Sequence, residues 1–185
     1  PMSGLNHAYD LASINPSIAY YAALSATGAI DSVSASFWRA VGAGNIRRMI
    51  QILEVARSTG FAIGASGGVA ATAGALGAIW RRFPAASMQC TQAASNACQV
   101  LRAMGQNPVV VRVTDRFGAR IFFMKDGVTR FAETGFHQAV FCNGYVYDAL
   151  TGPAGMCPGQ YALMMRNLGV HPVIQGLPHN PIWRP

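Results

Sequence analysis

Residues 136–150 read FHQAVFCNGYVYDAL, and this stretch predicts a β-hairpin. Asn143-Gly144 favours a two-residue turn, and β-branched and aromatic residues lie on both sides of it. A turn of this length pairs Ala139 with Asp148. Because side chains alternate between the two faces of a strand, His137 shares a face with Ala139. His137 and Asp148 therefore become diagonal neighbours on facing strands, which brings an imidazole within reach of a carboxylate.

The residues around this hairpin predict an antiparallel sheet followed by a helix. Apolar, β-rich runs separated by turn residues indicate strands that follow one another along the chain, which is typical of an α+β protein. Gln160 to Leu168 predicts a helix that ends at Gly169, and the proline-rich tail beyond it predicts irregular structure. The predicted strands are 109–113, 119–124, 128–131, 136–142 and 145–149.

A helix that begins with a cysteine precedes the sheet. Residues 90–104, CTQAASNACQVLRAM, have small or apolar side chains at helical spacing, and Gly105 stands where a C-cap glycine is expected. Cys90 falls in the first turn, where unpaired N–H groups and the helix dipole favour an anion and lower a thiol pKa. Cys98 lies deeper and is expected to be an inert core thiol. The alternative for Cys90 is a small buried hydrophobe of the same kind.

Cys90, His137 and Asp148 together have the residue types of a thiol catalytic triad. Asp148 can hold the tautomer of His137 and stabilise its imidazolium. His137 can then take the proton of Cys90 and return it to a leaving group. The alternative for Asp148 is a turn former that caps the chain toward Thr151-Gly152-Pro153. The triad predicts attack of a thiolate on an amide carbonyl.

This ordered set resembles the papain-like fold toxins found at the C-termini of bacterial polymorphic toxins, and it is similar to transglutaminase-like and deamidase domains. The resemblance covers about residues 85–170 and implies an α+β fold. In that fold a papain-like catalytic domain over residues 85–185, with the Cys helix packed on an antiparallel sheet, follows a helical Ala- and Gly-rich extension over residues 1–84. The matching pieces are Gln89-Cys90 before a helix ending LRAMG, the strand PVVVRV, His137-Gln138-Ala139-Val140, Gly144 to Asp148, and a helix from Tyr161 to Gly169.

The resemblance also implies roles for individual residues. By position, Cys90 is the nucleophile, His137 the general base and acid, and Asp148 the orienting acid. Papain carries a glutamine six residues before its cysteine as an oxyanion-hole donor, but here that position is Pro84. The expected donors are therefore the backbone N–H of Cys90 and Gln89. Removal of one such donor typically lowers the rate by about 10²–10³-fold.

The family implies a secreted toxin or effector enzyme that acts on a protein in the cytoplasm of a target cell. Glutamine deamidation or transamidation is the leading expectation, and a cysteine protease with the same triad is the alternative. Residues 1–16, PMSGLNHAYDLASINP, look like the junction where Rhs and YD-repeat toxin shells end and a C-terminal toxin begins. The expected partners are therefore a target protein and an immunity protein or an encapsulating shell.

Composition limits the other function classes. The 185 residues suffice for one domain with an extension. The chain is 51% hydrophobic and 11% charged, against a usual charged share of about a quarter, so a partner, a shell or a membrane is expected to cover part of it. The net charge of +7 comes from scattered arginines, which predicts no nucleic-acid partner. The cysteines and histidines lack metal-ligand spacings, so no metal and no cofactor are expected.

The N-terminal half leaves a rival hypothesis open. Residues 14–30 predict a short helix and residues 45–57 an amphipathic one. Residues 61–80, FAIGASGGVAATAGALGAIW, form an uncharged run of membrane-spanning length that is rich in Ala and Gly. This run is either a buried element broken at Gly67-Gly68 or a membrane-active segment. The rival is therefore a membrane-perturbing toxin that acts through residues 14–82, and a third hypothesis is a non-catalytic binding module.

Overall fold

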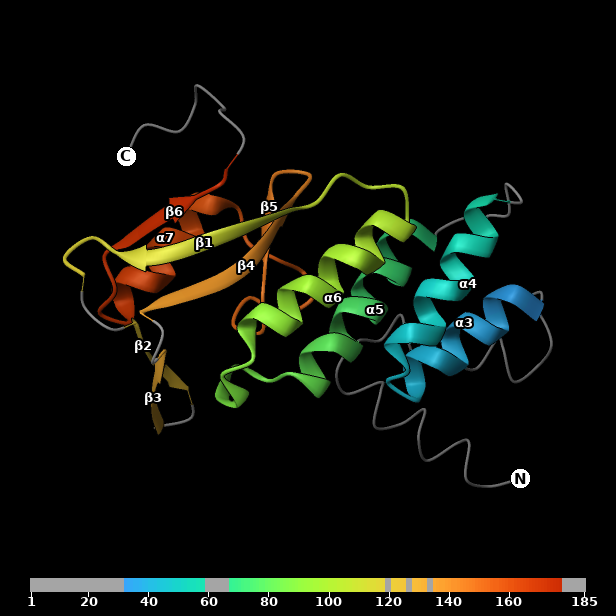
Figure 1. Cartoon of the computed structure of the whole chain (residues 1–185), viewed down its shortest axis with the longest axis horizontal. Coiled ribbons are helices and arrows are strands. Elements are labelled where there is room, and N and C mark those ends of the chain that lie inside the picture. Colours follow the sequence, from blue (N-terminus) through green and yellow to red (C-terminus); the bar gives the residue numbers. More distant parts are fainter. Residues whose placement is uncertain (1–31, 59–66, 119–120, 126–127, 133–134, 178–185) are drawn as a thin grey trace. The chain divides into compact units, whose positions relative to one another are not determined.

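The computed structural model describes residues 32–58, 67–118, 121–125, 128–132 and 135–177. Within these ranges the chain has a mixed α+β structure, with five α-helices and a four-stranded antiparallel sheet (Figure 1). The predicted α+β class is therefore confirmed. The helix predicted at residues 14–30 and the junction-like residues 1–16 lie outside the described residues.

The described residues fall into two compact units. The first contains the residues up to Arg82 together with 99–106, and the second contains 83–98 and the residues from 107 onward. The helix that begins at Cys90 thus contributes its first half to the second unit and its second half to the first. The domain boundary between residues 84 and 85 stays a prediction, because compact units need not fold independently.

The first unit is built from helices. It contains α3 (Ser32–Gly42), which the sequence analysis did not single out, α4 (Ile46–Ser58), predicted at 45–57, and α5 (Gly67–Arg82). No helix in the described part of the chain combines the length and apolarity needed to cross a membrane. The largest side chains that are fully buried in this unit are Phe37, Val41, Met49, Leu76, Ile79, Val100 and Leu101.

Helix α6 (Cys90–Ala103) follows a short 3₁₀ turn, η1 (Ala85–Ser87). The carbonyl of Gln89 accepts the first hydrogen bond of the helix from the Ala93 N–H at 2.9 Å. At the other end Gly105 has φ +78°, and the Gln106 N–H donates to the Leu101 carbonyl at 3.0 Å. This left-handed glycine ends the helix as its position in the sequence predicted.

The second unit contains a sheet with the strand order β5-β4-β1-β6. Its hairpin has the predicted register, with Val140 opposite Tyr147 and Cys142 opposite Tyr145. Both turn residues have positive φ, as a tight primed turn requires: 50° at Asn143 and 86° at Gly144. The strands are β1 (Val109–Asp115), β4 (Phe136–Cys142), β5 (Tyr145–Tyr147) and β6 (Pro172–Gln175).

Two details of the predicted sheet were wrong. Among the described residues, strands β2 (Ile121–Lys125) and β3 (Val128–Ala132) pair with each other and with no strand of the larger sheet, so the five predicted strands do not form one sheet. The fourth strand of the sheet is instead β6, in the tail that was predicted to be irregular. It is short and lies at the edge, where its initial proline is tolerated, so the local sequence gave no strand signal.

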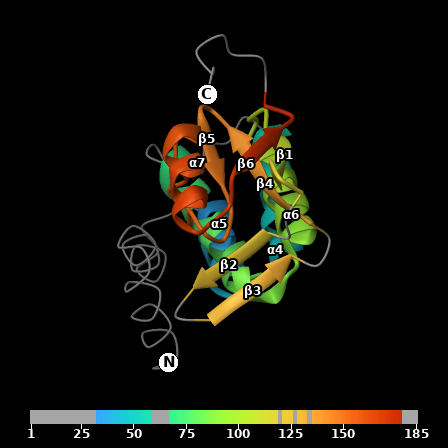
Figure 2. The same cartoon turned by 90° about the vertical axis from the view of Figure 1, so that its left-hand side faces the viewer.

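Helix α7 (Pro158–Asn167) packs on this sheet and forms the core of the second unit. Figures 1 and 2 show it lying along the strands. Proline at the first helical position, where an N–H would be unpaired in any case, favours the helix start. The core consists of Tyr161 and Met165 from the helix, with Val111, Val113, Ala139, Val146 and Val170.

Candidate active site

Cys90 is the first residue of α6 and is partly buried. The preceding Met88 has φ 59°, a left-handed conformation that turns the chain from η1 into the helix. The first N–H groups of a helix have no partner within it, and together with the helix dipole they favour an anion at this end. The local structure therefore places the thiol where a thiolate is stabilised.

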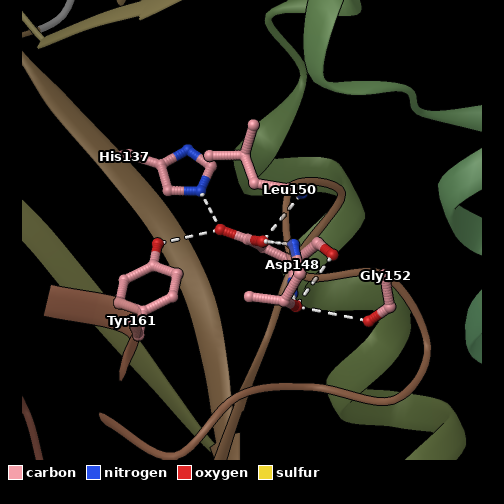
Figure 3. A network of polar contacts seen from close by, with 6 residues as sticks. His137, Asp148, Leu150, Gly152 and Tyr161 are labelled. Atoms are coloured by element: carbon pink, nitrogen blue, oxygen red, sulfur yellow. Dashed lines mark hydrogen bonds and ion pairs between the residues drawn. The ribbon is translucent and has the colours of Figure 1, made fainter. Parts of the chain in front are cut away.

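His137 is the second residue of β4 and lies opposite Val113 of β1. Its side chain is buried, and its Nε2 lies 2.8 Å from Oδ2 of Asp148 (Figure 3). The sequence predicted this neighbour relation from the register of the hairpin, and the structure brings the two side chains together. Since Nε2 faces the carboxylate, Nδ1 is the nitrogen left to interact with the thiol.

Asp148 is not on a strand as predicted, because β5 ends at Tyr147 and Asp148 opens the next turn. Its Oδ1 accepts the N–H groups of Leu150 and Thr151, both at 2.8 Å. Its own N–H donates to Oγ1 of Thr151 at 3.0 Å. Asp148 therefore forms the turn toward Thr151 through Oδ1, which was the alternative expected for this residue. At the same time its Oδ2 faces His137.

Tyr161 is the residue at this site whose role sequence reasoning missed. Its hydroxyl donates to Oδ2 of Asp148 at 2.8 Å, and the residue is fully buried. Figure 3 shows His137 and Tyr161 pointing at the same carboxylate oxygen. The only available signal was general, since a buried tyrosine usually finds a partner for its hydroxyl. Burial, followed by the Asp148 charge, raises the Tyr161 pKa well above its ordinary value, so the hydroxyl stays a donor.

The imidazole of His137 acts on the pKa of the Cys90 thiol both as a hydrogen-bond partner and as a charge. Burial, the largest single cause, raises the pKa of the thiol, and the hydrogen bond and charge of His137 lower it. The backbone N–H of Gln138 and the side chain of Thr91 lower the pKa further. The net effect is a thiol pKa below its ordinary value, which favours a nucleophilic thiolate.

The pKa of the imidazole moves in the opposite direction. Burial lowers the His137 pKa, but the hydrogen bonds and charges of Asp148 and Cys90 outweigh burial and raise it to about 9. Burial raises the pKa of Asp148, but its hydrogen bonds to His137, Thr151 and Tyr161 and the His137 charge lower it overall. The directions of these three pKa shifts favour a thiolate and an imidazolium beside an ionised carboxylate.

Gln89 is exposed and caps α6 through its backbone carbonyl. Its proposed part in an oxyanion hole stays a prediction.

No group of three or more His, Cys, Asp or Glu side chains within the described ranges is placed to hold a metal ion. None of the four cysteines, all of which are described, is in a disulfide; Cys98 and Cys142 are buried and Cys157 is exposed.

Comparison of the chain with protein-family models, with curated proteins and with solved structures finds no match. The functional assignment therefore depends on the geometry of the site and on the motifs that carry the family resemblance.

Proposed function

We propose that residues 85–185 form a papain-like catalytic domain, a cysteine-dependent amide hydrolase or acyl transferase. The observation that carries this proposal is the connected set of Cys90, His137 and Asp148. The thiol and the imidazole act on each other's pKa through hydrogen bonding and charge, and the imidazole lies 2.8 Å from a buried carboxylate. A nucleophile, a base and a group that orients the base are the parts that covalent acyl transfer requires.

The reaction follows from these three roles. The Cys90 thiolate attacks the carbonyl carbon of an amide, and the electron pair of the C=O bond moves to oxygen. Collapse of this tetrahedral intermediate breaks the C–N bond, and the imidazolium of His137 gives its proton to the departing amine. The product is a thioester on Cys90. Water, deprotonated by the neutral imidazole, then releases the acid and the thiol, whereas an amine in place of water gives a new amide.

The tetrahedral oxyanion needs hydrogen-bond donors near Cys90. The backbone N–H of Cys90 is one candidate, since it belongs to the first turn of α6 and has no partner within the helix. Gln89, the exposed residue that precedes the nucleophile in the chain, is the second candidate. Donors of this kind act by stabilising charge that develops only in the transition state.

The biological setting in this proposal is that of a toxin or effector domain delivered into a target cell. The motif order around Cys90, His137 and Asp148 and the junction-like residues 1–16 support it. The substrate is a protein of that cell, with glutamine side chains as the leading choice and backbone amides as the alternative. The partner before delivery is an immunity protein or an encapsulating shell, and the sparsely charged composition, 11% of residues, is consistent with a covered surface.

One incubation separates the reactions. The chain is mixed with a glutamine-rich acceptor protein and a fluorescent primary amine, and the products are read by intact-protein mass spectrometry. Conversion of amide to acid identifies deamidation, incorporation of the amine identifies transamidation, and fragments identify proteolysis. Cys90→Ala should abolish all three, and Cys157→Ala, which removes an exposed thiol outside the site, should abolish none. Equal activity of Cys90→Ala and wild type would contradict the proposal.

A further inference from the structure

The two oxygens of the Asp148 carboxylate are held by different parts of the fold. Oδ1 accepts two backbone N–H groups of its own turn, from Leu150 and Thr151. Oδ2 accepts from two side chains on other elements, Nε2 of His137 on β4 and the hydroxyl of Tyr161 on α7, each at 2.8 Å. The turn thus fixes where the carboxylate is, and Oδ2 is shared between the imidazole and the phenol.

Tyr161 is well placed to act on this oxygen. It is 0% exposed, and its ring packs in the core with Val111, Val113 and Met165. A side chain held by packing loses little further entropy when its hydroxyl donates, so the hydrogen bond is preorganised.

We infer that Tyr161 is a positioning residue of the Cys90–His137–Asp148 site, whose hydroxyl draws charge from Oδ2 and so limits how strongly Asp148 holds the His137 ring. This inference rests on the proposed function, since it assigns Tyr161 a part in the same site. Tyr161 does not meet the substrate in this account; it acts only through Asp148. Its role is to keep the imidazolium acidic enough to return its proton to a leaving group.

The consequence of removing the hydroxyl has a definite sign. The titratable groups that act on His137 are Cys90 from α6 and Asp148 from the turn after β5, and Tyr161 from α7 adjoins Asp148. Without the phenol, Oδ2 accepts from one hydrogen-bond donor instead of two. Its negative charge then acts more strongly on the imidazole of His137. The His137 pKa should therefore rise. A purely structural role for Tyr161 predicts the reverse, because a loosened carboxylate releases the imidazole toward its ordinary pKa.

The test is the titration of His137 by NMR, followed at its Cε1–H in the full chain. The His137→Gln spectrum assigns its resonance among the four histidines. In Tyr161→Phe, which keeps the ring, we expect the His137 pKa to rise by roughly one unit. The control Tyr145→Phe, in an exposed residue outside the hydrogen-bond network, should leave it unchanged. A pKa that stays the same or falls in Tyr161→Phe overturns the inference.

Two further measurements keep the outcome unambiguous. If Tyr161→Phe does not fold, the wild-type chain is produced with 3-fluorotyrosine, whose more acidic hydroxyl is a stronger donor; the His137 pKa should then fall, and an unchanged or raised value overturns the inference. Alkylation of Cys90 in the same samples tests the proposed function separately. An unreactive wild-type Cys90 would contradict the proposed function while the His137 titration still decides the role of Tyr161.

Discussion

Asp148→Asn separates the two tasks of this residue, because it removes the charge and keeps the shape. In the folded chain one carboxylate oxygen accepts two backbone N–H groups, and the other faces His137 and Tyr161. An asparagine must place its oxygen toward the backbone N–H groups, since its NH₂ group would oppose them. The NH₂ group then faces Nε2 of His137 and favours the tautomer with the proton on Nδ1. That tautomer cannot accept the proton of Cys90.

The size of the effect follows from the His137 pKa. The pKa moves from 6.5 to about 9, which corresponds to about 3 kcal/mol in favour of the charged imidazole. Asp148 is the largest of the causes that raise this pKa. Removing the charge of Asp148 should therefore remove most of this free energy. The protonation equilibrium of His137 then changes by roughly a hundredfold. Stability should fall too, by about 1–3 kcal/mol, because the NH₂ group cannot accept the hydrogen bond of the buried Tyr161 hydroxyl, although the hydrogen bonds of the backbone N–H groups to the other oxygen remain.

The assay is alkylation by iodoacetamide in mildly acidic buffer, read for each cysteine by mass spectrometry. We expect the rate at Cys90 to fall by roughly a hundredfold in Asp148→Asn. The exposed Cys157 of the same molecule serves as the internal control and should react at an unchanged rate. Near-UV circular dichroism checks that the variant is folded.

Asp148→Ala provides the contrast. It leaves the N–H groups of Leu150 and Thr151 and the hydroxyl of Tyr161 without their acceptor, at a cost of about 1–3 kcal/mol for each donor that stays buried. This variant should lose both reactivity and stability. A folded Asp148→Asn whose Cys90 reacts within about threefold of wild type would show that the Asp148 charge is not needed to activate the thiol through His137.

Two further outcomes are expected. Gly74→Ala should destabilise the first unit by about 1–3 kcal/mol in thermal denaturation, because a Cβ there would meet the Trp38 ring at 2.7 Å. Its matched control, Gly77→Ala in the same helix, meets only the flexible end of Arg81 at 3.7 Å and should gain up to about 1 kcal/mol; equal melting temperatures would contradict this. The His137 pKa is 6.5 in the unfolded chain and about 9 in the folded one. The resulting contribution to stability is complete at pH values below 6.5 and is lost as the pH rises through about 9. Wild type should therefore lose stability over that interval relative to His137→Gln, and parallel curves would contradict this linkage.

The parts of the site that lie close in sequence could be predicted because short-range rules determine them. The Asn143-Gly144 turn sets the hairpin register, and the register makes His137 and the residue after β5 diagonal neighbours. Helix α6 could be predicted from its apolar spacing and from Gly105, which ends it. These features depend on a few consecutive residues and not on the rest of the fold.

The long-range features could not be predicted in this way. Strand β6 pairs with β1, although more than half of the second unit's residues lie between them in the sequence. Nothing in the four residues of β6 specifies β1 as its partner. Strands β2 and β3 have the same kind of sequence as the strands of the main sheet, so their separation is a matter of tertiary packing. The contact of Tyr161 with Asp148 depends on how α7 packs, and a tyrosine on an apolar helix face is usually only core.

The alkylation rates of all four cysteines in wild type and in His137→Ala, measured in mildly acidic buffer, decide whether Cys90 and His137 form a thiolate–imidazolium pair. We expect Cys90 to react fastest although it is less exposed than Cys157, and to lose this advantage without His137. If Cys90 reacts no faster than Cys157 in wild type, or keeps its rate in His137→Ala, the thiolate–imidazolium pair does not exist and the proposed function is wrong.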